Sequence, residues 1–242
     1  RIRRFYVYAA AFRTFGRQAG LFDNADIPYN ILRTYGGNGG GHVFRSRQRQ
    51  KGGRVICGRF YCGGKMYYTF DYISPLGGIT MASDGQSLTG LWFDGQKYFA
   101  VNLPEEHIKR QLPVFMQAAE WLDVYFSGKA PNFTPPLSME GISPFRKRVW
   151  EIMLGIPFGQ VSTYGQIAKQ IAAETGRNVS AQAVGGAVGH NSISLIIPCH
   201  RVVGTNGSIT GYAGGIDKKL ALLKMEGVDV SGLFVPRKGT AL

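Results

Sequence analysis

Two short helix patterns separated by a glycine constrain the fold of this chain more than any other feature. The first, STYGQIAKQIAAETG, begins at Ser162 or Thr163 as the N-cap and stops at Gly176. The second, SAQAVGGAVGHN, begins at Ser180 as its N-cap. Two helices joined by a glycine-containing turn form a helix-turn-helix, so the sequence predicts this arrangement in the second half of the chain.

The second of these helices carries almost no side-chain bulk. Six of the nine residues over 181–189 are alanine or glycine. Small residues allow a helix to pack tightly inside a protein core. They also allow a helix to lie very close to something flat, such as a nucleic-acid backbone. The sequence leaves both interpretations open.

The part of the chain before this pair of helices predicts a small α/β domain. Three β-rich runs, MYYTFDYI, GGITMASD and SLTGLWFD, are separated by the turn-forming stretches SPLGG and DGQ, which predicts an antiparallel meander. Apolar residues at intervals of three and four predict a helix over 105–129, and GKAPNFTPP over 128–136 indicates a linker. Two further helices are expected over 143–157 and 214–227, the last with Asp217 as its N-cap and Gly227 as its stop.

Residues 1–65 differ from the rest in charge and pattern. They hold 13 Lys and Arg against 2 Asp, whereas residues 66–242 hold 15 basic and 13 acidic residues. The segment fits a basic arm for nucleic acid or a disordered leader. It also fits a non-native extension, because the chain opens on arginine and not on methionine. In addition, the codons for Gly63-Gly64-Lys65 could contain a ribosome-binding sequence just upstream of a start codon at Met66. The net charge of the whole chain therefore does not identify what the main body binds.

The three cysteines and the absence of long apolar runs indicate the type of compartment. Cys57, Cys62 and Cys199 make an odd count, which favours free thiols in a reducing, cytoplasmic compartment over a disulfide scaffold. A zinc site at Cys57 and Cys62 would need further ligands, and no second pair follows them, so we predict no metal site. No apolar run reaches the roughly 18 residues of a membrane span.

The stretch ISLIIPCHRVVG, residues 193–204, is the candidate for chemistry. An apolar run, interpreted as a buried strand, ends at Pro198, and Cys199 and His200 follow directly. A thiol becomes a good nucleophile when a nearby imidazole lowers its pKa or takes its proton. Neighbours in an extended chain point to opposite faces, so the two side chains would meet only across a turn or through a water molecule. Taken alone, the dipeptide fits a buried structural cysteine better than a catalytic one, because free cysteines are commonly buried.

Several motifs together resemble one family, the O6-alkylguanine-DNA alkyltransferases, also called methylated-DNA–protein-cysteine methyltransferases. They are VSTYGQIA, AVGGAVGHN, PCHRVVG, GSITGYAGG and LLKMEG, and they span the C-terminal hundred residues. The resemblance implies a ribonuclease-H-like α/β domain over 66–136 and a winged-helix-like alkyltransferase domain with the helix-turn-helix over 137–236. The leader, 1–65, and a tail, 237–242, complete the predicted organisation.

The resemblance also implies an activity. The protein would bind double-stranded DNA through the helix-turn-helix, flip an O6-alkylguanine out of the stack, and transfer the alkyl group irreversibly to its own cysteine. O4-alkylthymine is a further expected substrate. Each molecule would react once, as a monomer and without a cofactor. The competing hypotheses are a non-catalytic alkyl-DNA sensor, a helix-turn-helix regulator with a structural or redox cysteine, and a cysteine hydrolase.

Five residues would carry the reaction if the family's roles apply here. Cys199 would accept the alkyl group, and His200 would act as the base through a water molecule. Glu226 would orient His200, and Asn191 would tie the backbone of the site together. Tyr164 would contact the flipped base and the phosphate beside it.

The same resemblance implies contacts to the base and to DNA. Tyr212 would line the alkyl pocket, and the Ala213 N–H would face O6. The carbonyls of Cys199 and Val202 would accept hydrogen bonds from the guanine amino group. Gly214 and Gly215 would leave space for the loop to pass close to the base. The expected DNA-binding residues are Ser180, Ala181, Gln182, Ala183, Gly185, Val188 as an apolar wedge, and Arg201. Gln182 stands where many members of the family have arginine. It keeps hydrogen-bonding capacity but lacks the charge and the reach.

Overall fold

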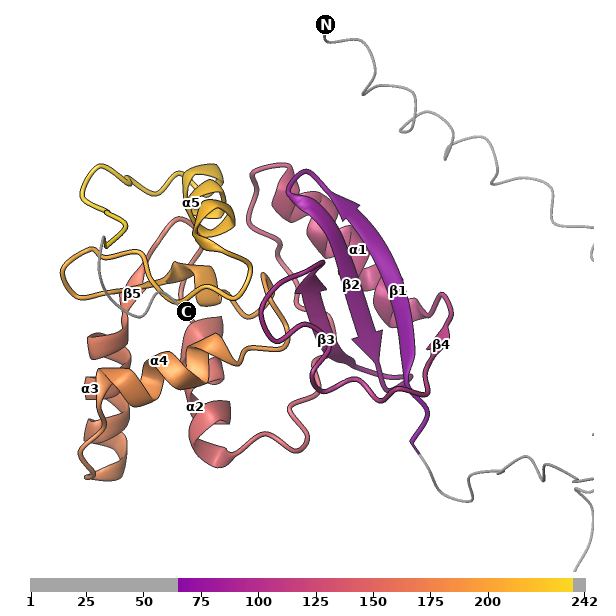
Figure 1. Ribbon diagram of the computed structural model, residues 1–242, viewed down its shortest axis with the longest axis horizontal. Coiled ribbons are helices and arrows are strands. Elements are labelled where there is room, and N and C mark those ends of the chain that lie inside the picture. The colour runs from indigo at the N-terminus through magenta and orange to yellow at the C-terminus, as the bar shows by residue number, and fades with distance from the viewer. Residues whose placement is uncertain (1–64, 237–242) are drawn as a thin grey trace, which may run out of the picture. The chain divides into compact units, whose positions relative to one another are not determined.

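The computed structural model describes residues 65–236. Three features considered from the sequence lie outside the described residues. They are the predicted leader except for Lys65, the cysteines Cys57 and Cys62 considered as zinc ligands, and the tail over 237–242. Within 65–236, a four-stranded sheet with one helix against it is followed by a second part built from four helices (Figure 1). No helix in this range is long and apolar enough to cross a membrane.

The predicted meander is confirmed and gains a fourth strand. β1 (Tyr68–Ser74), β2 (Gly77–Ser83) and β3 (Leu88–Phe93) pair antiparallel, and the sheet order is β3-β2-β1-β4. β4 (Ile108–Lys109) pairs parallel with β1. These two residues had been expected at the start of a helix, so the prediction was wrong there.

Helix α1 (Pro113–Phe126) begins later than the apolar pattern suggested, and proline explains why. The residue before a proline is pushed out of helical geometry, and Leu112 is extended, with φ −124° and ψ 156°. Pro113 then starts the helix, where its missing N–H costs nothing. The helix packs on the sheet, with the ring of Phe115 stacked 5.9 Å from that of Phe70.

The helix-turn-helix forms as predicted from local capping. α3 (Tyr164–Thr175) has a capping box at Thr163 and ends at Gly176, which adopts the left-handed conformation with φ 67°. α4 (Ala181–Gly189) is capped by Ser180, whose hydroxyl accepts from the Ala183 N–H. The pair packs against α2 (Pro144–Leu154), from which Trp150 Nε1 donates to the Ala187 carbonyl at 3.0 Å.

Two further predictions need correction. α5 (Ile216–Met225) is preceded by Gly215 at the N-cap position, so Asp217 lies in the first turn and does not cap the helix. The apolar run before Pro198 is not a strand: only Ile193 forms a bridge, to Leu91 of β3, and Leu195 has a φ of +70°. The run is buried, but an apolar run this short does not distinguish a strand from a packed loop.

The two parts share one hydrophobic core. It includes Phe93 of β3 and Tyr125 of α1, and it continues into the second part through Trp150, Ile197 and Cys199. A short parallel pair, β5 (Ser162–Thr163) and β6 (Val202–Val203), joins the start of α3 to the segment after the cysteine. The packing therefore connects the first domain directly to the Cys-His stretch.

Candidate active site

Cys199 lies at the start of a tight turn that also contains His200 and Arg201. Residues Cys199–Arg201 form one turn of 3₁₀ helix, and the Arg201 N–H donates to the Pro198 carbonyl at 3.0 Å. The turn removes the obstacle that an extended backbone would have posed for adjacent cysteine and histidine side chains. Both are buried, with the whole cysteine residue 3% exposed.

His200 and Glu226 form a buried pair. His200 Nε2 lies 2.6 Å from Glu226 Oε1, and both side chains are fully buried. A carboxylate can only accept, so the hydrogen belongs on Nε2 and the lone pair of neutral imidazole belongs on Nδ1. Burial lowers the pKa of His200 below its ordinary value, although the hydrogen bond and charge of Glu226 act in the opposite direction. The imidazole is therefore held neutral with Nδ1 free to take a proton.

Arg201 completes this ion network, which corrects its predicted role in binding DNA. Its Nε donates to Glu226 Oε2 at 2.9 Å, its Nη2 donates to Oε1 at 3.1 Å, and its Nη1 donates to the Ile156 carbonyl at 2.7 Å. Only 7% of Arg201 is exposed. Its guanidinium faces inward because the Glu226 carboxylate needs a permanent cation beside it when both are buried.

Glu226 receives more donors than a histidine-orienting carboxylate requires. Its Oε2 also accepts from the Gly159 N–H at 3.1 Å. Burial by itself raises the pKa of Glu226, but the hydrogen bonds donated by His200 and Arg201 and the charge of Arg201 outweigh burial and lower it to about 2. The carboxylate is therefore ionised at any physiological pH.

Asn191 ties the cysteine segment together, as the family resemblance implies. Its Nδ2 contacts the Ile197 carbonyl at 2.8 Å, the Ile193 carbonyl at 3.3 Å and Cys199 Sγ at 3.2 Å, and its Oδ1 accepts from the Ile193 N–H at 3.0 Å. One side chain thus supplies hydrogen bonds that a neighbouring strand would otherwise provide. This accounts for the loop geometry found in place of the predicted strand.

A buried lysine that the sequence analysis did not single out lies near enough to Cys199 for its charge to act on the thiol pKa. Lys219 of α5 is fully buried, and its Nζ donates to the carbonyls of Val202 and Thr210. Burial lowers its pKa to about 8. Burial raises the pKa of the Cys199 thiol, while the Asn191 hydrogen bond and the Lys219 charge lower it. The sequence signal was its position three residues before Leu222, on the buried face of α5.

The loop after β6 carries the residues expected to hold the base. Tyr164 donates its hydroxyl to the Thr210 carbonyl at 3.0 Å. Tyr212 is 1% exposed, and its ring meets that of His200 edge-on at 6.4 Å. Gly214 is required by close packing, because a Cβ there would lie 2.7 Å from the Tyr212 ring. The Val202 carbonyl already accepts from Lys219, although a carbonyl has a second lone pair for a base.

Two unpartnered polar atoms lie within this cluster. In the described part of the chain, the buried side-chain nitrogen and oxygen atoms without a hydrogen-bond partner are Gln96 Nε2, His200 Nδ1 and Tyr212 Oη. Such groups are costly when buried, and they concentrate where a protein meets a ligand or a reacting group. His200 contributes an acceptor and Tyr212 a donor to the surroundings of the Cys199 thiol.

Helix α4 presents some of its small residues outward, whereas Ala187 and Gly189 are buried. Ala181, Gln182, Ala183 and Gly186 are exposed, and a Cβ on Gly186 would meet nothing within 4 Å. Packing inside the protein therefore does not require glycine at 186, which favours close approach by an external partner. Val188 is only 1% exposed and belongs to the core. This burial contradicts its predicted role as a wedge into DNA.

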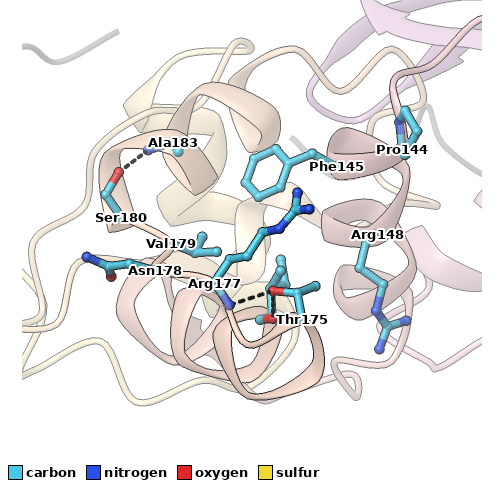
Figure 2. A pocket seen from close by; sticks show the side chains of 10 residues that line it. Pro144, Phe145, Arg148, Thr175, Arg177, Asn178, Val179, Ser180 and Ala183 are labelled. Atoms are coloured by element: carbon cyan, nitrogen blue, oxygen red, sulfur yellow. Dashed lines mark hydrogen bonds between the residues drawn. The ribbon is translucent and has the colours of Figure 1, made fainter.

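A separate cavity of about 610 Å³ lies between α2 and the turn of the helix-turn-helix (Figure 2). Phe145, Arg148, Arg177 and Val179 are among its lining residues. Arg148 is already paired with Glu174. Because the lining does not include Cys199, this cavity is not part of the thiol site.

Comparisons with known proteins match both parts of the chain. Residues 66–139 match the family model described as 6-O-methylguanine DNA methyltransferase, ribonuclease-like domain. Residues 144–228 match 6-O-methylguanine DNA methyltransferase, DNA binding domain.

Curated relatives and solved structures match over the same region. Methylated-DNA–protein-cysteine methyltransferase of Mycobacterium tuberculosis (strain H37Rv) is 42% identical over 160 residues, 66% of this chain and 91% of that protein. The Haemophilus influenzae protein of the same name is 40% identical over 162 residues, 66% and 86% of the two chains. The crystal structure of M. tuberculosis O6-methylguanine methyltransferase matches with a TM-score of 0.58 and 40% identity, over 66% and 93%. That of M. tuberculosis OGT in complex with DNA matches with a TM-score of 0.56 and 40% identity, over 70% and 99%.

Proposed function

Because the chain belongs to the 6-O-methylguanine DNA methyltransferase family, we propose that it repairs DNA by moving the alkyl group of O6-alkylguanine onto Cys199. The observation that carries the proposal is the buried Cys199-His200-Glu226 cluster, with Nε2 of the histidine bonded to the glutamate and Nδ1 unpartnered. DNA is the partner, as it is in the structure of the M. tuberculosis relative. Specificity for O6-alkylguanine, with O4-alkylthymine as a second substrate, and a monomeric state are parts of the proposal.

The proposed reaction is one in-line displacement. The proton of the Cys199 thiol passes through a water molecule to Nδ1 of His200, and the sulfur attacks the alkyl carbon as that carbon's bond to O6 breaks. The electron pair of the broken bond goes to the guanine, whose developing negative charge is stabilised by the Ala213 N–H at O6 and by the Tyr212 hydroxyl. The guanine anion then takes up a proton at N1 as the imidazolium gives one up, so the products are an S-alkylcysteine and guanine restored in DNA. No group in the site cleaves a thioether, so each molecule reacts once.

Glu226 and Asn191 support this step through different partners, His200 and Cys199. Glu226 accepts the Nε2 hydrogen and stabilises the imidazolium that forms when His200 takes the proton. Asn191 donates to Sγ at 3.2 Å, which stabilises the thiolate. Tyr164 is proposed to contact the flipped base beside Thr210, to which its hydroxyl is bonded.

We propose that α4 approaches the DNA backbone and supports base flipping. The proposed contacts are those of its exposed or half-buried N-terminal residues, Ser180, Ala181, Gln182, Ala183 and Gly185. The proposed domain limits are 66–136 for the ribonuclease-H-like part and 137–236 for the DNA-binding part, and both family matches lie close to them. A reactive free thiol suits a reducing compartment, so we infer a cytoplasmic location.

Intact-mass measurement tests the function. Incubated with a duplex containing O6-methylguanine, the protein is expected to gain the mass of one methyl group, located on the peptide that contains Cys199. A second dose of DNA should add nothing, because the thioether is permanent. Binding without a mass change would match an alkyl-DNA sensor or a regulator, and repeated turnover would match a hydrolase.

The exposed Gln182 allows a test of base flipping. Gln182→Arg is expected to tighten binding to alkylated duplex by about tenfold at low salt, because arginine adds a charge and a longer reach. The slope of the logarithm of the binding constant against the logarithm of the salt concentration should become steeper by about the amount that one phosphate contact contributes. The measurement is a fluorescence-anisotropy titration at several salt concentrations. Gln182→Lys is the control, because lysine adds the same charge without the planar set of N–H donors that an arginine guanidinium has. Unchanged or weaker binding by the arginine variant would remove Gln182 from the proposed contacts.

A further inference from the structure

A tyrosine from the first domain reaches into the catalytic pair. Tyr125 lies near the end of α1 and is fully buried, 101 residues before Glu226 in the sequence. Its hydroxyl lies 2.7 Å from Glu226 Oε1 and 3.1 Å from His200 Nε2. The same phenol oxygen thus contacts both members of the pair.

The proton positions at this junction follow from what each group can donate. Glu226 is an ionised acceptor, so the single Tyr125 hydroxyl proton points to Oε1 over the shorter distance. The oxygen of Tyr125 then offers a lone pair toward the Nε2 hydrogen of His200. Burial and the charge of Glu226 raise the pKa of Tyr125 well above its ordinary value, so the phenol keeps its proton. Both acceptors beside Nε2 favour the tautomer that leaves Nδ1 bare.

The packing around the ring of Tyr125 holds its hydroxyl in a fixed position. The ring stacks on Trp121 at 5.2 Å and meets Phe158 edge-on at 5.9 Å. It also meets the His200 ring edge-on at 6.1 Å. A hydroxyl at the end of a ring packed on several sides cannot turn away without moving the core.

We propose that Tyr125 is a positioning residue through which the ribonuclease-H-like domain sets the tautomer and orientation of His200. The inference rests on the proposed function, because it gives the His200 orientation a purpose in alkyl transfer. It assigns that domain a part in the chemistry besides its part in folding. The hydroxyl touches neither the thiol nor the base, so its effect passes through His200 and Glu226.

The test compares two tyrosines whose hydroxyls donate to a carboxylate over the same distance. Tyr125→Phe removes only the oxygen at the site. Tyr72→Phe removes a hydroxyl that donates to Asp123 at the same 2.7 Å, outside the site. We expect Tyr125→Phe to lower the single-turnover transfer rate by about tenfold, the effect of losing one hydrogen bond to a charged group. Affinity for methylated duplex should stay within about twofold, and Tyr72→Phe should transfer at the wild-type rate.

The dependence of the rate on pH separates positioning from a merely structural effect. The charged and titratable groups around His200 are Glu226 and Lys219 of the α5 region, Cys199 and Arg201 of its own turn, Tyr212 and Tyr125. Without the Tyr125 hydroxyl, Oε1 loses a donor and attracts the imidazolium more strongly. The acid limb of the rate profile should therefore move to higher pH by at least about half a unit. If Tyr125→Phe transfers at the wild-type rate and the acid limb of its pH-rate profile does not move, the proposal is overturned.

A measurement on the wild-type chain covers the case in which the variant fails to fold. The nitrogen chemical shifts of His200 are expected to show a protonated Nε2 and a bare Nδ1, with a slowly exchanging Tyr125 hydroxyl proton close to the ring. A proton on Nδ1 overturns the proposal. This readout needs no DNA, so it remains decisive even if the wild-type protein transfers no alkyl group, which would instead refute the proposed function.

Discussion

Cys199→Ser is expected to abolish alkyl transfer, with the rate falling by about 10⁴-fold or more, the scale seen when a nucleophile is removed. A hydroxyl ionises far less readily than a thiol, and a base as weak as neutral imidazole does not make serine a good nucleophile toward an alkyl carbon. The exposed face of α4 is unchanged, so affinity for methylated duplex should remain within a few-fold of wild type. The measurement is transfer of a radiolabelled methyl group under single-turnover conditions.

The other two cysteines provide the control. A Cys57→Ser, Cys62→Ser double variant should transfer at the wild-type rate, because both residues lie outside the region that matches the family. Label found on either of their peptides, or transfer by Cys199→Ser at more than a small fraction of the wild-type rate, would mean that Cys199 is not the acceptor.

Glu226→Gln is expected to remove both activity and stability. The amide cannot balance the Arg201 guanidinium, which would be left buried without a counter-charge, and breaking such a pair costs about 3–5 kcal/mol in free energy of unfolding. The amide nitrogen would also present a donor toward Nε2, which favours the wrong tautomer of His200. We expect the transfer rate to fall by about a hundredfold or more. Urea unfolding and single-turnover transfer are the two measurements.

The same pair sets a dependence of stability on pH. The folded-state pKa of Glu226, about 2, lies below its ordinary value of 4.5. The pairing therefore stabilises the fold fully above about pH 4.5 and is lost as the pH falls toward 2. The wild-type protein should lose this contribution over that window, whereas Glu226→Gln should not.

Glu174→Gln is the matched control for an arginine-paired glutamate. Glu174 accepts from Arg148 Nε at 2.7 Å and from Nη2 at 2.6 Å, in the same two-pronged geometry, but it lies on the surface. Water screens such a pair, so little change in unfolding or transfer is expected. If the two variants lost equal stability, burial of the Glu226 pair would not be the cause.

Local rules explain which parts of the fold could be predicted from sequence. The caps at Thr163 and Ser180 and the left-handed Gly176 act on backbone groups within a few residues, so the helix-turn-helix followed from the chain itself. The start of α1 was also encoded locally, by Pro113, but the apolar periodicity upstream obscured it. Nearby turn residues likewise indicated the meander.

The sequence identified which residues belong to the candidate site better than it predicted how their side chains are arranged. Cys199, His200, Glu226 and Asn191 were identified through their motifs, and the structure brings Asn191 into contact with Cys199 and Glu226 into contact with His200. Arg201 and Val188 were given the wrong surroundings. A side chain at the edge of a motif can turn toward the core or toward solvent, and only the packing decides which.

By itself, the sequence determined the helix-turn-helix and the meander, because caps and turns depend on neighbours along the chain, and its motifs singled out Cys199 and His200 as candidates. Only the tertiary structure decided that Arg201 faces inward, that Lys219 is buried against the Val202 carbonyl, and that Tyr125 joins the first domain to the His200-Glu226 pair. The physical reason is that hydrogen bonds between buried groups far apart in the chain form only when the core closes around them. No local pattern of residues records which distant partner each will meet.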